Sequence, residues 1–182
     1  MSFQLPSIAR SRMNLRATRA CWLILQLLGL WYPQVLPAQQ RIDCVVSHIT
    51  DGDTFWARCP DDVKVRLLLI DAPERDQFPF GRQAKAAIEK LLPLRSRVAL
   101  ELDVQSTDRY GRTLAYVFLP DGQMVNEEMA REGYAIALVY PPNVRYVERI
   151  RKAVVQARAA RRGLWAQGGF ACTPKDHREK RC

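Results

Sequence analysis

The alternation of hydrophobic and polar positions divides the chain into short strand-like segments, with helical segments between and after them. Five segments are rich in β-branched and aromatic residues, and turn residues bound most of them. They are residues 44–50, 53–59, 63–70, 97–104 and 113–119. Three others have the composition or the apolar spacing of helices: 81–92, 126–132 and 143–163. This order predicts an α+β protein that is mainly a β barrel, a five-stranded Greek-key barrel of the OB-fold type with three helices.

The last of these helices has clear expected ends. Asn143 is a favourable N-cap residue, and Gly163 follows two arginines that suit the C-terminus of a helix. The apolar residues that recur at helical spacing form its expected buried stripe: Val147, Ile150, Val154 and Ala157.

The first two strand-like segments are separated by Asp51-Gly52, a strong signal for a two-residue hairpin turn. With that turn, Cys44 faces Cys59 across the hairpin, which favours a disulfide at its base. A bulge in either strand would shift this register. The hairpin therefore predicts the Cys44–Cys59 pair, provided that the strands stay in step.

The N-terminal segment has the composition of a secretory signal peptide. Residues 1–20 contain four arginines and no acid, and an apolar run follows at 21–32. Cleavage after Ala38 gives a signal peptide at 1–38 and a secreted or periplasmic protein. An uncleaved anchor is the alternative, because Leu36 is large for its place before the cleavage site. The apolar run is shorter than the ~18–20 residues of a spanning helix.

Removal of this segment changes both the charge and the cysteine count. The whole chain has a formal net charge of +9. Without the four arginines, 24 basic residues face 19 acidic ones, so the excess falls to five. Four cysteines remain, and an even number in an exported protein indicates disulfides. Besides Cys44–Cys59, the favoured pair is Cys172–Cys182, which would staple a C-terminal tail at 166–182 and add stability.

Three charged clusters are candidates for chemistry: 51–54, 66–74 and 107–112. Each alone is typical of a turn, a strand exit or a solvated loop. Together they supply three carboxylates at strand ends, which are hard oxygen ligands suited to Ca²⁺ or Mg²⁺. They also supply Arg66 and Arg112, whose forked donors suit phosphate. Because Arg66 and Asp71 are five residues apart, Asp71 must lie beyond the regular strand, at the bend before Pro73.

In combination, order and spacing, these motifs resemble the staphylococcal nuclease family, calcium-dependent nucleases on an OB-fold. The motifs are I-T-D-G-D-T at 49–54, R-L-L-L-I-D-A-P-E at 66–74 and T-D-R-Y-G-R at 107–112. Shorter matches extend the resemblance to R-R-G-L-W at 161–165. The resemblance implies a nuclease-like OB-fold domain at 39–165.

The resemblance also implies a metal site and a residue for the attacking water. Asp53 and Asp71 match calcium ligands of the family, and the main-chain carbonyl of Ala72 completes the protein part of that site. Glu74 matches the residue that activates the nucleophilic water. Ca²⁺ is therefore the expected cofactor.

The substrate side follows from the same resemblance. Arg66 and Arg112 match the phosphate-binding pair, and Tyr110 and Tyr140 match tyrosines that contact the bound nucleotide. The family cleaves DNA and RNA and leaves 3′-phosphates. One departure is Leu138, which stands where the staphylococcal enzyme has a further tyrosine, and another is a shorter loop after Glu74.

Two other classes of protein compete with this interpretation. A catalytically inert OB-fold module that binds nucleic acid would typically have lost the acidic and arginine residues, which are all present here. A membrane-surface protein would need exposed apolar residues on the basic helix, whose apolar stripe is expected in the core. We therefore expect a monomeric nuclease whose partners are DNA and RNA, with no stable membrane partner.

Overall fold

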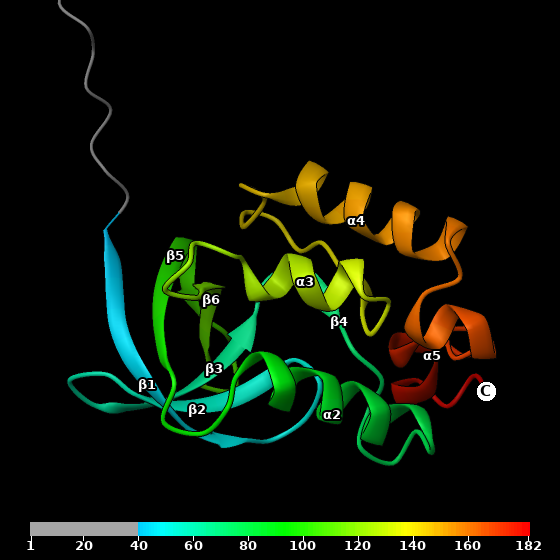
Figure 1. Ribbon diagram of the computed structural model, residues 1–182, viewed down its shortest axis with the longest axis horizontal. Coiled ribbons are helices and arrows are strands. Elements are labelled where there is room, and N and C mark those ends of the chain that lie inside the picture. Colours follow the sequence, from blue (N-terminus) through cyan, green and yellow to red (C-terminus); the bar gives the residue numbers. More distant parts are fainter. Residues whose placement is uncertain (1–39) are drawn as a thin grey trace, which may run out of the picture. The chain divides into compact units, whose positions relative to one another are not determined.

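A computed structural model describes residues 40–182, so the predicted signal peptide lies outside the described residues. Five strands close into a barrel in the order β1-β2-β3-β6-β5 (Figure 1). Their bounds are β1 Arg41–Ile49, β2 Thr54–Arg58, β3 Asp62–Leu67, β5 Arg97–Thr107 and β6 Thr113–Phe118. Neighbouring strands are antiparallel except β3 and β6, which are parallel. The predicted five-stranded barrel is confirmed.

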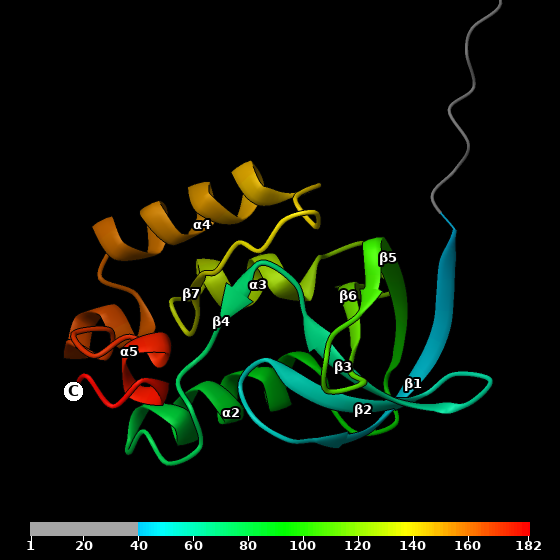
Figure 2. The same cartoon turned by 180° about the vertical axis from the view of Figure 1, so that it is seen from behind.

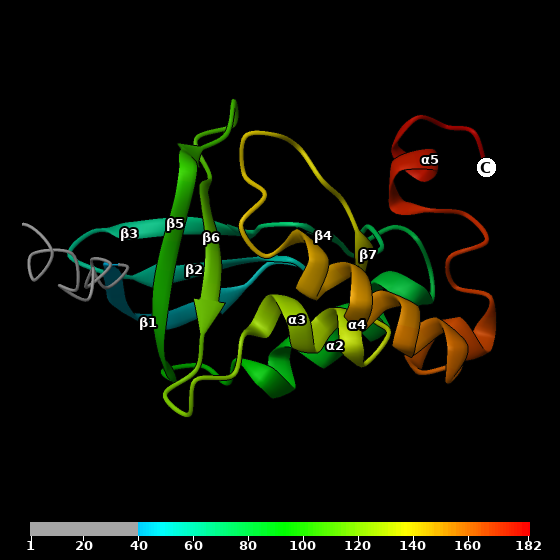
Figure 3. The same ribbon diagram turned by 90° about the horizontal axis from the view of Figure 1, so that it is seen from above.

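Helices lie beside the barrel and enclose the rest of the core (Figure 3). Their bounds are α2 Phe80–Leu91, α3 Val125–Arg131, α4 Val147–Ala159 and α5 Pro174–Arg178, with a 3₁₀ helix η1 at Gly163–Gln167. Helix α3 lies between α2 and α4 (Figure 1). Helix α4 buries Ile150, Ala153 and Ala157, whereas Val147 and Val154 are only partly buried. The short helix α5 was not predicted.

The β1–β2 hairpin has the expected register only at its open end. Val45 pairs with Arg58, but a bulge after Val46 shifts the pairing by one residue towards the turn. The bulge lies beyond the cysteines, so it does not separate them. Cys44 and Cys59 are joined by a disulfide, as predicted.

The prediction of one continuous strand at 63–70 is wrong for residues 68–70. Strand β3 ends at Leu67, and Leu69 has a left-handed backbone conformation with φ of 65°. The chain then forms a separate strand, β4 (Ile70–Asp71), which pairs with β7 (Ile136–Ala137) outside the barrel. The apolar run hides this break because both parts are buried, so hydrophobicity alone does not mark it.

A buried asparagine holds the break in place. The side-chain Oδ1 of Asn126 accepts a hydrogen bond from the Val117 N–H at 2.9 Å. Its Nδ2 donates to the carbonyls of Leu68 at 3.0 Å and Ala115 at 3.1 Å. Since Leu68 belongs to the turn between β3 and β4, Asn126 ties helix α3 to the point where the chain leaves the barrel.

Replacing Asn126 by alanine is expected to lower the free energy of unfolding by about 2–4 kcal/mol, because buried backbone groups lose their partners. Urea denaturation measures this change. Replacing the exposed Gln123 by alanine is a suitable control and should change stability little. A loss below about 0.5 kcal/mol for Asn126→Ala would contradict this role.

The start of the last long helix differs from the expectation. Helix α4 begins at Val147, after an N-cap residue, Tyr146, that makes no side-chain capping bond. Asn143 does not cap it. Its Oδ1 accepts from the Gln105 N–H and its Nδ2 donates to the Gln105 carbonyl, both at 2.8 Å. The Asn143 side chain thus makes, near the end of β5, the two backbone hydrogen bonds that a neighbouring strand would make.

The C-terminal segment packs on the loop that follows Glu74 (Figure 2). Gln77 Nε2 donates to the Cys172 carbonyl at 2.8 Å, and His177 Nε2 lies 3.0 Å from Asp76 Oδ1. The predicted Cys172–Cys182 disulfide is present. From residue 40 onward, the structure contains no helix long and apolar enough to cross a membrane.

Candidate active site

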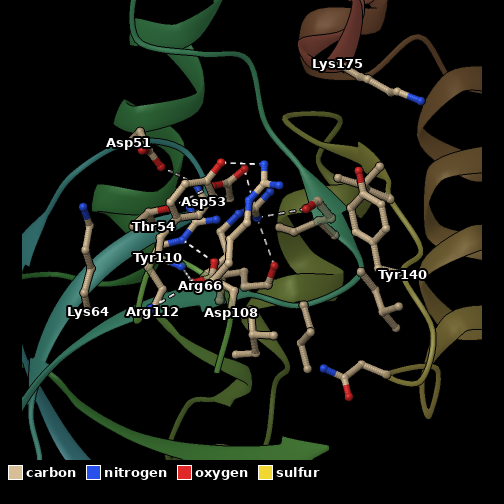
Figure 4. A pocket seen from close by; sticks show the side chains of 18 of the residues that line it. Asp51, Asp53, Thr54, Lys64, Arg66, Asp108, Tyr110, Arg112, Tyr140 and Lys175 are labelled. Carbon is tan, nitrogen blue, oxygen red and sulfur yellow. Dashed lines mark hydrogen bonds and ion pairs between the residues drawn. The ribbon is translucent and has the colours of Figure 1, made fainter. Parts of the chain in front are cut away.

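An open pocket of about 1030 Å³ collects the charged clusters found in the sequence. Its walls come from the ends of β2 and β3, the β5–β6 loop, the segment after β7 and helix α5 (Figure 4). The cationic side chains that line it are Lys64, Arg66, Arg109, Arg112, Lys175 and Arg178. The acidic ones are Asp51, Asp53, Glu74, Asp108 and Glu179.

Arg66 joins the two carboxylates that were expected to bind metal. Its Nη1 lies 3.0 Å from Asp53 Oδ2, and its Nη2 lies 3.1 Å from Asp71 Oδ1. The Asp71 side chain is 1% exposed and that of Asp53 is 10% exposed. The turn at Leu69 brings Arg66 and Asp71 together, which a continuous strand would have placed on opposite faces. Asp71 therefore lies beyond the barrel strand, as predicted, but within β4.

Asp51, in the turn between β1 and β2, adds a third carboxylate beside Asp53 and Asp71. The sequence had indicated only a hairpin turn at this residue. Burial, and next the charge of Asp53, raise the pKa of Asp51 to about 6. Burial also raises the pKa of Asp71, against the effect of Arg178 and Arg66. Carboxylates this close repel one another unless positive charge neutralises them, and in this structure Arg66 and Arg178 supply that charge.

The donor chemistry fits a hard divalent cation. Asp53 and Asp71 supply carboxylate oxygens, and Ala72 is held beside them because its N–H donates to Asp53 Oδ2 at 2.9 Å. Within residues 40–182, no group of three or more His, Cys, Asp or Glu side chains is arranged as a metal-binding cluster. The ligand set that the family resemblance implies, two carboxylates and the main-chain carbonyl of Ala72, stays a prediction.

Glu74 lies at the edge of this group and lines the pocket with a side chain that is 34% exposed. Its backbone is fixed by helix α2. A Cβ atom on Gly81 would lie 1.9 Å from the Glu74 carbonyl oxygen, so only glycine permits this close approach. The main chain of Glu74 is therefore held firmly while its carboxylate faces the pocket.

Arg112 reaches the pocket from the β5–β6 loop, and Asp108 organises that loop. The N–H groups of Tyr110 and Arg112 donate to Asp108 Oδ1, and Arg112 Nε donates to Asp108 Oδ2 at 2.7 Å. Burial acts to raise the pKa of Asp108, but these bonds from Arg112 and Tyr110 lower it overall. Asp108 is thus a charged support that fixes the guanidinium of Arg112.

The two predicted nucleotide-contacting tyrosines lie on either side of Arg66 (Figure 4). Tyr110 is 67% exposed and Tyr140 is 64% exposed. The hydroxyl of Tyr110 accepts a hydrogen bond from Arg109 Nη2 at 2.6 Å. Leu138 also lines the pocket, and its N–H donates to the Leu69 carbonyl. Two aromatic rings are therefore available to a ligand.

Arg178 of helix α5 is the site residue that the sequence did not indicate. Its Nη1 donates to Asp71 Oδ1 at 3.1 Å and to Glu74 Oε1 at 2.5 Å, and its Nη2 donates to Asp71 Oδ2 at 2.9 Å. The hydrogen bond to Asp71 is the main cause of the raised pKa of Arg178. The paired cysteines indicated a stapled tail, but no pattern around Arg178 pointed to the pocket.

The structure thus joins four predicted residues, Arg66, Asp53, Asp71 and Glu74, through ion pairs that include Arg178. Arg112, Tyr110 and Tyr140 line the same pocket from other elements.

A closed barrel with carboxylates and arginines in one open pocket defines the class: an OB-fold protein with a charged pocket beside the barrel. The chain belongs to the family of staphylococcal nuclease homologues, whose model matches residues 64–167.

Individual relatives agree with this membership. The chain is 38% identical over 127 residues to the thermonuclease of Staphylococcus hyicus, a match that covers 66% of this chain and 74% of that protein. It is 39% identical to the thermonuclease of Staphylococcus intermedius, with the same coverage. It is also 34% identical over 141 residues to the endonuclease YncB of Bacillus subtilis, covering 72% of this chain and 65% of that protein.

Proposed function

We propose that the protein is a calcium-dependent nuclease that hydrolyses phosphodiester bonds of DNA and RNA and leaves 3′-phosphates. The observation that carries this proposal is the pairing of Arg66 with both Asp53 and Asp71, next to Glu74, in a pocket that Arg112 also lines. Relatives named thermonuclease and endonuclease support nuclease activity.

Calcium would be held by the carboxylates of Asp53 and Asp71 and by the main-chain carbonyl of Ala72. When bound, the ion supplies positive charge that stabilises negative charge on the phosphoryl oxygens. The residues around it then position the substrate and the proton acceptor.

Glu74 is the proposed acceptor of the proton from the attacking water. Its carboxylate lines the pocket while its backbone is fixed against Gly81, so it can meet a water molecule without a change in the main chain. A positioned general base typically contributes about 10²–10⁴ in rate. Because water is the nucleophile, the 2′-hydroxyl of RNA is not needed, so DNA and RNA are both substrates.

Arg66 and Arg112 are the proposed donors to the phosphate. Arg66 is held by two main-chain carbonyls, those of Leu67 and Ile70, in addition to its carboxylates. Arg112 is held through Nε by Asp108. Such preorganised donors stabilise the charge that develops on the phosphoryl oxygens in the transition state more than the charge of the substrate.

Tyr110 and Tyr140 are the proposed contacts to the nucleotide, because exposed aromatic rings stack on bases without regard to sequence. Lys64, Arg109 and Lys175 add positive charge to the pocket wall and suit a polyanionic strand. We further propose that the protein is exported, acts as a monomer, and has no stable membrane partner.

The test is cleavage of single-stranded DNA and RNA, each with a 5′-fluorophore that phosphatase does not remove, by the purified protein with its disulfides formed. In Ca²⁺ we expect both the DNA and the RNA to be cut. The labelled fragments should end in 3′-phosphate, which a change in their mobility after phosphatase treatment would show. Fragments with 3′-hydroxyl ends would contradict the proposed bond cleavage.

The second candidate is an inert OB-fold module that binds nucleic acid. The five charged residues Asp53, Arg66, Asp71, Glu74 and Arg112 argue against it, since binding alone does not require them. Retention of the labelled strand on the protein, with no cleavage in Ca²⁺, would favour that module instead.

A further inference from the structure

The C-terminal tail places a second arginine, after Arg66, on the carboxylates of the proposed site. Arg178 is the last residue of helix α5, which packs on the loop after Glu74. Its guanidinium donates to both carboxylate oxygens of Asp71 and to one of Glu74. The Arg178 side chain is 39% exposed, whereas that of Asp71 is 1% exposed. Arg178 is therefore a cation that enters from the surface and ends on a buried carboxylate.

The hydrogen bonds leave little room for another cation at Asp71. Each carboxylate oxygen has two lone pairs. Oδ1 of Asp71 accepts from Arg66 Nη2 and from Arg178 Nη1, so both of its lone pairs are used. Oδ2 accepts from Arg178 Nη2, which leaves one lone pair. A metal ion that binds Asp71 must share these oxygens with a guanidinium or displace it.

Charge adds to this competition. A dication at Asp53 and Asp71 and a guanidinium on Asp71 would repel each other at short range, and this repulsion is strong in a partly buried site. Arg66 is also bonded to Asp53 and the backbone, whereas the bonds of Arg178 to the site are to Asp71 and Glu74 alone. Of the two arginines on Asp71, Arg178 is thus the one that can leave the carboxylate.

We propose that Arg178 is an internal competitor of calcium, a displaceable cation that sets the affinity of the site through Asp71 and Glu74. The inference rests on the proposed calcium site. Calcium binding then moves the guanidinium off Asp71, and the nuclease becomes active only above a calcium concentration that Arg178 helps to fix.

The disulfide keeps this competitor close to the site. Arg178 lies inside the loop that the Cys172–Cys182 bond closes. Thr173 caps α5 by accepting from the Asp176 N–H, and Arg181 pairs with Asp176 within the same loop. A short closed loop holds Arg178 at a high effective concentration beside Asp71. Opening the loop should weaken the competition without removing the arginine.

The experiment is calorimetric titration of calcium into the oxidised protein, without nucleic acid. Arg178→Ala should bind calcium at least about tenfold more tightly than the wild-type chain, since a charged hydrogen-bond partner is lost. Arg181→Ala is the matched control. It removes the same charge from the same loop, but it pairs with Asp176 and Glu179 and not with the proposed calcium ligand Asp71, so the calcium affinity should stay within about twofold of wild type.

A second variant tests the disulfide and does not depend on the stability of Arg178→Ala. The Cys172→Ser/Cys182→Ser protein, which keeps Arg178, should shift in the same direction by a smaller factor. Equal or weaker calcium binding by both Arg178→Ala and the serine variant would overturn the inference while leaving the calcium site in place. Absence of calcium binding in every variant would overturn the proposed site as well.

Discussion

Replacing Glu74 by glutamine is expected to lower turnover of single-stranded DNA by about 10²–10⁴, the usual contribution of a positioned general base. The amide has nearly the same shape as the carboxylate, so the pocket keeps its form, but an amide cannot accept a proton from water. The loss should appear in kcat more than in KM, because the group acts on the reacting water and not on the bound strand.

The control for this variant is Glu148→Gln. Glu148 is an exposed acid of helix α4 that pairs with Arg151, so the change removes one negative charge without touching the pocket. Its turnover should equal that of the wild-type protein. Unfolding temperatures of both variants should match wild type within a few degrees. Near-normal turnover by Glu74→Gln would remove Glu74 from the proposed mechanism.

Replacing Arg112 by lysine is expected to lower turnover by about 10²–10³, the cost of losing one preorganised donor to a developing oxyanion. Lysine retains the positive charge but not the planar fork that Asp108 holds through Nε. The variant should therefore still bind the strand electrostatically and fail at the chemical step, which single-turnover measurements separate from binding.

The matched substitution is Arg151→Lys on the exposed face of helix α4, where the arginine pairs with Glu148. It should leave both turnover and strand binding unchanged. If Arg112→Lys retained normal single-turnover rates, the geometry of the Arg112 guanidinium would have no part in the reaction and its proposed role would be wrong.

The barrel and its first hairpin were predictable because local signals determine them. The turn signal at Asp51-Gly52 and the facing cysteines predict the hairpin, and Cys44 does pair with Cys59. The register next to the turn is the exception, because a bulge after Val46 shifts it by one residue. Family motifs identified the candidate site residues. Six of them line one pocket: Asp53, Arg66, Glu74, Tyr110, Arg112 and Tyr140. Asp71 and Ala72 are buried and do not line it. These features are encoded by residues that are close in sequence or recur at fixed spacing.

Features that depend on contacts distant in sequence were not predictable. The break at Leu69 is fixed by Asn126, which binds the Leu68 carbonyl from 58 residues away. Asn143 has the residue type of a helix cap, yet the backbone of Gln105 takes its hydrogen bonds. Local preference was outweighed at both places by buried backbone groups that needed partners.

Arg178 is a third example, and the proposed competition with calcium depends on it. It lies 104 residues from Glu74, in a tail to which the sequence assigned only stability. The predicted pairing of Cys172 with Cys182 does not tell which arginine of the tail reaches the pocket. Only the packing of the tail on the loop after Glu74 places it there.

The most direct test of the proposed function is the calcium dependence of cleavage in one sample. A labelled single-stranded oligonucleotide is followed with the oxidised protein in Ca²⁺, then in excess EGTA, then after Ca²⁺ is restored. We predict cleavage, arrest and recovery, with strand binding still detectable in EGTA. Cleavage that continues at the same rate in EGTA, or a properly folded protein that never cleaves in Ca²⁺, would contradict the assignment of Asp53, Asp71 and Glu74 to a calcium-dependent nuclease site.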